Sequence, residues 1–353
     1  MSEKDLFTWL ERENLLETAK KSYPAFKSIL NNSLKLHGEK LVLIGDFGLP
    51  EHRVSPLVLA CYALAAREMN ADYEILVKDI TANNDSEDIA ERLKHLSSQN
   101  SIVAVMSQKF NRLAKLEKSF RTFVRERRHR FVSTPGLAQL STEHFQHLVD
   151  ALSVDYYEMF ERGQRLKRVI DDASELFIST DRGTALHIDV KNMPGINNSG
   201  IYEKSGSGGN IPAGEVYCAP NRNRVEGRVV VDGSIRTLEG TILLKKPVTM
   251  TFEKGLLVEM EGESAKYLEE SLRWAEENSS RPYGIRRFAE LGIGTNPKAS
   301  IVGPTVINEK ALGTAHIAIG SNYWFGGSIY APIHLDHVFK NPVIEADGER
   351  VDF

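Results

Sequence analysis

The sequence has too few cysteines to build a scaffold from disulfide bonds. Its 353 residues include only two, Cys61 and Cys218, and neither belongs to a Cys-x-x-Cys pair. This excludes a disulfide framework and a cysteine-based zinc site. Both cysteines lie among apolar or strand-forming residues, so we expect buried, free thiols.

Long hydrophobic runs are absent as well. The longest apolar run, Pro56–Ala66, is far short of the roughly 20 residues that a membrane span needs. The stretch Met1–Lys20 mixes acids and bases and has no apolar centre of the kind that marks a secretory signal. We therefore expect a cytoplasmic protein with no membrane partner.

Neither sign of charge is in large excess, since the formal net charge is −4. This near balance gives no reason to expect a nucleic-acid partner. The glycine motifs Gly-x-Gly-x-x-Gly and Gly-x-x-x-x-Gly-Lys-Ser/Thr are both missing, so we expect no nucleotide cofactor. Hydrophobic residues make up 41% of the sequence and charged residues 26%. This composition is sufficient for a sizeable hydrophobic core.

The first half of the chain alternates between two periodicities. Short apolar runs predict buried strands at 40–46, 73–77, 102–106 and 130–133. Helical periodicity predicts helices between them, at 54–69, 86–96 and 110–125. Strands separated by helices of about a dozen residues indicate βαβ units and a mostly parallel sheet.

The second half is rich in short strands and turns from Leu176 onward, with one clear helix at 266–278. A long polar stretch, Asn192–Gly214, is predicted to be a loop, and loops of this length are usually functional or disordered. We therefore expect an α/β protein with two domains. Residues 1–170 would form a three-layer α/β scaffold with a mostly parallel sheet. Residues 171–353 would form a β-rich α+β domain that carries a metal site.

Five residues of the second half are candidate metal ligands. His334 and Asp336 are two residues apart, so on a strand both side chains project from the same face. His316 and Glu290 each lie in an apolar run, where an ionised carboxylate is costly unless it is paired or bound to metal. Glu215 follows a glycine-rich stretch at the start of a predicted strand.

Each of these signals also has a purely structural interpretation. A His-x-Asp pair occurs often by chance, a lone buried histidine is usually a core residue, and a glutamate at a strand start is usually exposed. Taken together, two imidazoles and up to three carboxylates are the mixed ligand set of hydrolytic Zn, Co or Mn centres. Such a set is large enough for two ions if one carboxylate bridges them.

The same residues lie in short motifs that resemble the aminopeptidase T family of two-metal thermophilic and leucyl aminopeptidases. The resemblance covers roughly residues 176–340. The motifs are Asn210-Ile211-Pro212 ahead of Glu215, Glu290-Leu291-Gly292 before Asn296-Pro297, His316 seven residues before Tyr323, and His334-x-Asp336.

This resemblance implies a homodimeric enzyme that removes N-terminal residues from peptides. Its metal ligands would be Glu215, Glu290, His316, His334 and Asp336, binding two divalent ions (Zn, Co or Mn). Tyr323 would stabilise the oxyanion of the transition state, and either Glu215 or Glu309 would be the general base.

The chain departs from the family pattern at two points. Gly214 stands where the family has an additional acid, and Glu309 lies seven residues before His316, where the family has a glutamate five residues before. Two alternatives follow. One is an Fe(II)-dependent ring-cleaving dioxygenase of the same superfamily, in which a histidine would match Glu290. The other is a catalytically inactive, peptide-binding relative.

Overall fold

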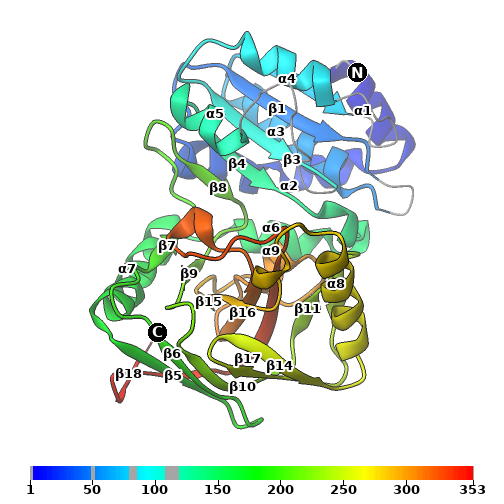
Figure 1. Cartoon of the computed structure of the whole chain (residues 1–353). Coiled ribbons are helices and arrows are strands. Elements are labelled where there is room, and N and C mark those ends of the chain that lie inside the picture. Colours follow the sequence, from blue (N-terminus) through cyan, green and yellow to red (C-terminus); the bar gives the residue numbers. More distant parts are fainter. Residues whose placement is uncertain (1–2, 49–51, 79–85, 108–118, 353) are drawn as a thin grey trace. The chain divides into compact units, whose positions relative to one another are not determined.

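The structure is a computed structural model that describes residues 3–48, 52–78, 86–107 and 119–352 (Figure 1). The chain forms two compact units. Unit 1 comprises Met1–Tyr156 and Gly200–Ala213, and unit 2 comprises Tyr157–Ser199 and Gly214–Phe353. Residue 170, the predicted domain boundary, lies inside helix α7 (Tyr156–Asp172). The division into domains 1–170 and 171–353 stays a prediction.

Unit 1 is built on a parallel sheet with the strand order β2-β1-β3-β4-β8. The first four strands lie within one or two residues of their predicted positions. They are β1 (Leu41–Asp46), β2 (Tyr73–Lys78), β3 (Ser101–Val105) and β4 (Arg130–Thr134). The other elements are α1 (Glu3–Arg12), α2 (Leu16–Ser28), the π-helical turn η1 (Ile29–Ser33), α3 (Val54–Glu68), α4 (Ser86–Lys94), α5 (Phe120–Glu126), η3 (Leu137–Gln139), η4 (Thr142–His144) and α6 (Phe145–Leu152).

Helices cover both faces of this sheet. Val42 and Ile44 of β1 share a core with the apolar residues of α4 and α5. The opposite face of β1 presents Gly45, where an added Cβ would lie 2.9 Å from a methyl carbon of Leu59 on α3. The predicted three-layer α/β arrangement is confirmed. Of the helix predicted at 110–125, residues 110–118 lie outside the described residues, and the described part begins at Phe120.

The polar stretch predicted to be a loop instead contains two strands, β7 (Ile196–Asn198) and β8 (Gly208–Asn210). Strand β8 pairs in parallel with β4 and completes the sheet of unit 1 (Figure 1). An added Cβ at Gly208 would lie 2.1 Å from the Phe131 ring, and one at Gly209 would lie 2.3 Å from the Tyr202 hydroxyl. The glycines that indicated a loop are therefore required for close packing in a strand.

Unit 2 contains two seven-stranded sheets whose pairs are antiparallel. Their strand orders are β14-β13-β10-β6-β5-β18-β19 and β12-β11-β17-β16-β15-β9-β7. Apolar residues from both sheets, from α7 and from α8 form one core. The remaining elements are β5 (Glu175–Ser179), β6 (Ala185–Asp189), β9 (Glu215–Cys218), β10 (Val225–Val231), β11 (Ser234–Arg236), β12 (Thr241–Leu243), β13 (Val248–Glu253), β14 (Leu256–Glu261), α8 (Ala265–Glu277), η5 (Pro282–Gly284), β15 (Phe288–Gly294), α9 (Thr305–Asn308), β16 (Thr314–Gly320), η6 (Tyr323–Phe325), β17 (His334–Lys340), β18 (Val343–Ala346) and β19 (Glu349–Arg350). The predicted β-rich character of this half is confirmed.

Among the helices of the described ranges, none combines the length and the apolar composition that a bilayer crossing requires.

Candidate metal centre

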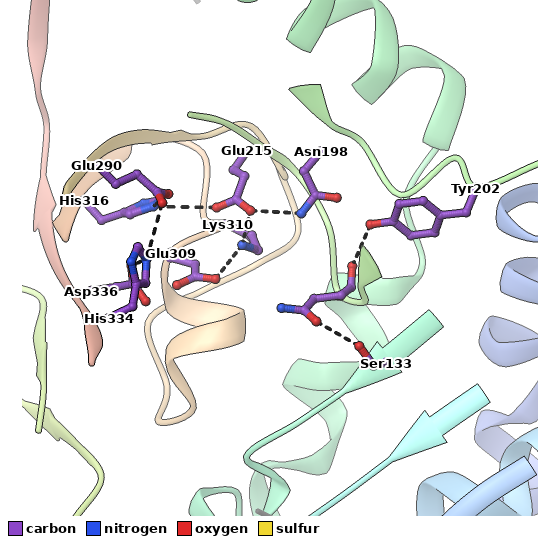
Figure 2. A network of polar contacts seen from close by, with 11 residues as sticks. Ser133, Asn198, Tyr202, Glu215, Glu290, Glu309, Lys310, His316, His334 and Asp336 are labelled. Carbon is purple, nitrogen blue, oxygen red and sulfur yellow. Dashed lines mark hydrogen bonds and ion pairs between the residues drawn. The ribbon is translucent and has the colours of Figure 1, made fainter. Parts of the chain in front are cut away.

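The five candidate ligands lie on four neighbouring strands of one sheet. Strand β9 carries Glu215, β15 carries Glu290, β16 carries His316, and β17 carries both His334 and Asp336. Figure 2 shows these side chains converging on one cluster. The structure therefore brings together all five residues, although up to 121 positions separate them in the sequence (336 − 215 = 121).

Small residues make room for these side chains. Glu215 pairs with Gly294, Glu290 and Asp336 each pair with Ala318, His316 pairs with Gly292, and His334 pairs with Gly320. Gly292 faces a ligand ring directly, because an added Cβ would lie 2.1 Å from Nε2 of His316. The glycines and alanines within these apolar runs therefore let bulky polar side chains lie across the sheet.

Glu290 lies between the two imidazoles. Its Oε1 is 3.3 Å from Nε2 of His316, and its Oε2 is 3.3 Å from Nε2 of His334. The same His334 nitrogen is 3.1 Å from Oδ1 of Asp336. Nδ1 of His334 donates to the carbonyl oxygen of Ser321 at 2.7 Å, which fixes the ring and directs Nε2 into the cluster.

The charges of the cluster favour a cation. Burial lowers the pKa of His316, but the hydrogen bond to Glu290 and the charges of two further glutamates raise it to about 9. Burial likewise opposes protonation of His334, yet its pKa lies well above the ordinary value, chiefly because of Asp336. Burial raises the pKa of Glu290, and its two imidazole partners outweigh this and lower it. The carboxylates thus stabilise positive charge at both histidines.

Glu309 also reaches the cluster. It directly follows α9, is only 8% exposed, and belongs with His316 and Asp336 to a group whose ligand atoms lie within 4.8 Å of one another. Two further groups meet the same limit, namely Glu215 with Glu290 and His316, and Glu290 with His334 and Asp336. Burial raises the pKa of Glu309 to about 7, against the opposing charge of Lys310.

Lys310 is a site residue that the sequence analysis missed. Its side chain is 1% exposed, and its Nζ lies 2.5 Å from Oε1 of Glu215 and 2.5 Å from Oε1 of Glu309. Burial alone would lower its pKa, but the two carboxylates raise it above the ordinary value. The sequence offered only a weak signal, a lysine beside a candidate acid in the stretch Val306–Ala311, which also contains the polar Asn308.

Asn198 on β7 was missed as well. Its Nδ2 donates to Oε1 of Glu215 at 2.9 Å, so this carboxylate has one neutral and one charged donor (Figure 2). Asn198 belongs to the polar stretch that was predicted to be a loop. Its role depends on a strand pairing that a single sequence does not reveal.

Tyr323 lies on η6, between β16 and β17, and is 48% exposed. Its ring stacks on Tyr330 with 3.8 Å between the centroids. The next residue, Trp324, contacts His334, with 5.0 Å between the ring centroids. The predicted catalytic role of Tyr323 stays a prediction.

Comparison with known proteins supports the dioxygenase alternative over the predicted aminopeptidase. A family model described as 2,5-dihydroxypyridine 5,6-dioxygenase matches residues 22–352. The 2,5-dihydroxypyridine 5,6-dioxygenase of Pseudomonas putida strain KT2440 is 24% identical over 193 residues, which is 52% of this chain and 54% of that protein. The chain thus matches about half the length of this curated relative.

Two solved structures share the fold. The 2,5-dihydroxypyridine dioxygenase from Pseudomonas putida KT2440 has a TM-score of 0.70 at 16% identity, covering 94% of this chain and 95% of that one. Wild-type AmpT from Thermus thermophilus has a TM-score of 0.66 at 16% identity, covering 94% and 97%. At these identities the likeness shows the fold alone.

The aminopeptidase prediction was wrong. The family match overturns the predicted hydrolase, protease and peptide-substrate assignments, and the relation to aminopeptidase T is one of architecture only. The physical reason is that histidines and carboxylates on neighbouring strands suit hydrolytic and oxygen-using metal centres alike. Short motifs around such ligands do not separate the two chemistries. The predicted homodimer stays a prediction.

Proposed function

This chain belongs to the 2,5-dihydroxypyridine 5,6-dioxygenase family, and from that premise we propose that it is a metal-dependent dioxygenase that opens a hydroxylated pyridine-type ring. The observation that supports this most strongly is the pair of imidazoles, His316 and His334, arranged around Glu290 beside Asp336. Two histidines with carboxylates are the ligand types of non-haem Fe(II) oxygenases.

The residues of the cluster fit a divalent ion. The ligands would come from His316, His334, Asp336 and Glu290. The space at Gly292 holds the His316 ring, and the carbonyl of Ser321 orients His334. A bound redox-active ion such as Fe(II) would supply the chemistry that lets oxygen react with the ring. One of these ligands, Glu290, stands at the position where we expected the dioxygenases of the superfamily to have a histidine.

The charges favour one ion rather than two. Lys310 already provides a buried positive charge to Glu215 and Glu309, whereas His334 pairs with the other two acids, Glu290 and Asp336 (Figure 2). A second divalent cation at the same oxygens would have to displace this ammonium. The predicted two-ion centre is therefore replaced in this proposal by a centre of one ion.

The other side chains position the reacting groups. The backbone carbonyl oxygen of Ser321 accepts a hydrogen bond from Nδ1 of His334. The carboxylate of Glu290 lies beside Nε2, the other nitrogen of the same ring. Asn198 and Lys310 hold the buried carboxylate of Glu215. Glu309, with its pKa raised to about 7, is suited to accept and return a proton near neutral pH.

Metal analysis combined with oxygen uptake tests this function. We expect about one iron per chain, and oxygen consumption with 2,5-dihydroxypyridine that EDTA abolishes. His316→Ala should lose both iron and activity. His187→Ala, which removes an exposed histidine of the same unit, should retain both. An iron-loaded wild-type protein that consumes no oxygen with any dihydroxylated pyridine would refute the proposal.

A further inference from the structure

Among the described residues of the candidate centre, His334 and Asp336 are the most exposed to solvent. The side chains of His334 and Asp336 are 18% and 16% exposed, whereas those of Glu290 and His316 are 7% and 1% exposed. A molecule that approaches the cluster from solvent therefore meets His334 and Asp336 first. The residues next to this edge are the ones that can contact such a molecule.

Trp324 lies at that edge. Its ring centroid is 5.0 Å from that of His334 at an interplanar angle of 64°, and the residue is 51% exposed. The neighbouring Phe325 is buried, packing against Tyr217 and His334. The chain thus places one aromatic ring beneath the edge of the centre and leaves a second one beside it in contact with solvent.

The segment that carries Trp324 is held firmly. Asn322 is 1% exposed, its Nδ2 donates to the carbonyl of Ala289 on β15, and its Oδ1 accepts from the backbone N–H of Ile329. Gly327 fits only because it has no side chain, since an added Cβ would lie 2.0 Å from Cγ of Asn322. An exposed tryptophan on a segment tied to a ligand-bearing strand is pre-organised for contact.

The described aromatic neighbours of Trp324, namely Tyr323, Phe325 and His334, all lie at steep angles to the indole, so none of them is stacked parallel on it. Tyr323 and Tyr330 stack on each other, with 3.8 Å between centroids and 20° between planes. Tyr323 meets Trp324 edge-on, at 89° and 5.9 Å, and therefore does not stack on its face. Indole faces favour offset stacking with planar rings, and a hydroxylated heteroaromatic ring is such a partner.

We propose that Trp324 is the residue on which the aromatic ring of the substrate stacks while its oxygen substituents face His334 and Asp336. This inference rests on the proposed function and specifies its substrate as a planar aromatic ring rather than an extended or aliphatic molecule. Trp324 is then a determinant of substrate affinity and specificity. It has no part in binding the metal.

Trp274 provides a matched control. It lies on α8 of the same unit, an element that carries none of the candidate ligands, and is 57% exposed, so it presents a comparable indole to solvent. Replacing Trp274 therefore tests the general effect of losing an exposed tryptophan. Replacing Trp324 tests the additional effect of its position beside His334.

The experiment measures binding without turnover. The affinity for 2,5-dihydroxypyridine is determined by calorimetry under argon, on metal-loaded and on metal-free protein, for wild type, Trp324→Ala, Trp324→Phe and Trp274→Ala. We expect about ten-fold weaker binding for Trp324→Ala, with smaller losses for Trp324→Phe. The ligand should quench the tryptophan fluorescence of the wild type and of Trp274→Ala, but that of Trp324→Phe much less. Iron content and circular dichroism should match wild type in all variants.

The outcomes separate the two proposals. Normal affinity and an unchanged KM in Trp324→Ala would overturn the stacking role while leaving the dioxygenase function intact. Tight binding that quenches Trp324, with no oxygen uptake by the iron-loaded protein, would refute the function and support the stacking role. No binding of the ring by the wild-type protein would overturn the stacking inference outright.

Discussion

At the scale of single residues, the candidate site is governed by an imbalance of charge. Four carboxylates, those of Glu215, Glu290, Glu309 and Asp336, lie close together and mostly buried. Buried carboxylates repel one another unless a cation compensates them. Lys310 compensates two of them within the chain, and the imidazoles face the other two.

Replacement of Lys310 should therefore change how many metal ions the protein holds. Lys310→Met removes the charge at nearly constant volume and leaves Glu215 and Glu309 buried without it. We expect a loss of about 3 kcal/mol in the metal-free protein, and a rise from about one to about two divalent ions per chain, as in two-metal centres. Urea unfolding and elemental analysis after dialysis measure the two effects.

The charge-preserving variant Lys310→Arg serves as the control for this prediction. It should keep the stoichiometry of the wild type, since a guanidinium still pairs with the carboxylates. A Lys310→Met protein that binds no more metal than the wild type would contradict the view that this ammonium stands in for a second ion.

The sequence was a good guide to ligands and a poor guide to their partners. Glu290 and His316 could be recognised because polar residues in apolar runs require an explanation wherever they lie. Lys310 could not, because a lysine next to a glutamate is ordinarily a surface pair. Only the fold shows that Lys310 and Glu309 are both buried and that Lys310 also pairs with Glu215, which lies on the distant strand β9.

At the scale of elements, the ligand-bearing strands depend on the small residues that face the ligands. Gly292→Ala places a methyl group where the His316 imidazole lies, so the ring must move. We expect metal affinity to fall roughly ten-fold or more, as it does when the orientation of a ligand is disturbed. Competition with a chromogenic chelator measures the change.

Gly195→Ala is the matched control for Gly292→Ala, because an added Cβ there meets ordinary contacts at 3.4 Å. Its metal affinity should equal that of the wild type. Equal affinities in both alanine variants would show that His316 does not bind the metal.

The connection from β16 to β17 depends on Asn322. Asn322→Asp keeps the shape of the side chain but turns its donor into a carboxylate oxygen facing the carbonyl of Ala289. We expect a loss on the order of 3 kcal/mol in the free energy of unfolding. The substitution buries a negative charge and removes the hydrogen bond that the amide donated. Chemical denaturation measures it.

Asn341→Asp makes the same chemical change at an exposed position and should cost within about 0.5 kcal/mol. A similar small effect at both positions would mean that Asn322 does not anchor the segment, and it would weaken the argument for a pre-organised Trp324.

Elements with strong periodicity were predicted well, and those defined by pairing were not. Strands β1 to β4 are apolar runs between turn signals, so local sequence is enough to place them. Strand β8 is Gly208-Gly209-Asn210, which has no apolar side chain and exists only because β4 offers an edge. Its glycines are needed because any side chain at these positions would clash with Phe131 or Tyr202. The local sequence does not reveal this requirement.

At the scale of the whole molecule, the fold does not determine the reaction. The chain shares its fold with a dihydroxypyridine dioxygenase and with AmpT at nearly the same similarity. The fold class could therefore be predicted from the alternation of strands and helices, while the reaction could not. Similarity along residues 22–352 decided the family, where five ligand residues alone pointed elsewhere.

Overall stability should fall in acid partly through one histidine of unit 1. His129 is fully buried and its Nδ1 accepts from the backbone N–H of Asn100. Burial, aided by the charge of Arg127, lowers its pKa from 6.5 to about 4. Between these values the unfolded chain binds the proton and the folded one does not, so stability decreases as pH falls from 6.5 towards 4.

This group should contribute a loss of about 3 kcal/mol by pH 4. His129→Asn keeps an acceptor but cannot titrate, so its unfolding free energy should decline less between pH 7 and pH 4. His95→Asn, at an exposed histidine, controls for the loss of an imidazole. Parallel pH profiles for wild type and His129→Asn would exclude this mechanism.

The late position of β8 constrains how the protein can be made. The first four strands of the parallel sheet end at Thr134, but the fifth begins only at Gly208. During synthesis on the ribosome, the edge of β4 therefore stays unpaired until β8 has been made. That takes more than seventy further residues (208 − 134 = 74). A fragment that stops at Tyr156 keeps that edge permanently, and open strand edges recruit other chains. Expression of unit 1 by itself thus calls for residues 200–213 to be grafted back, and a single cut in the gene does not yield two self-sufficient halves.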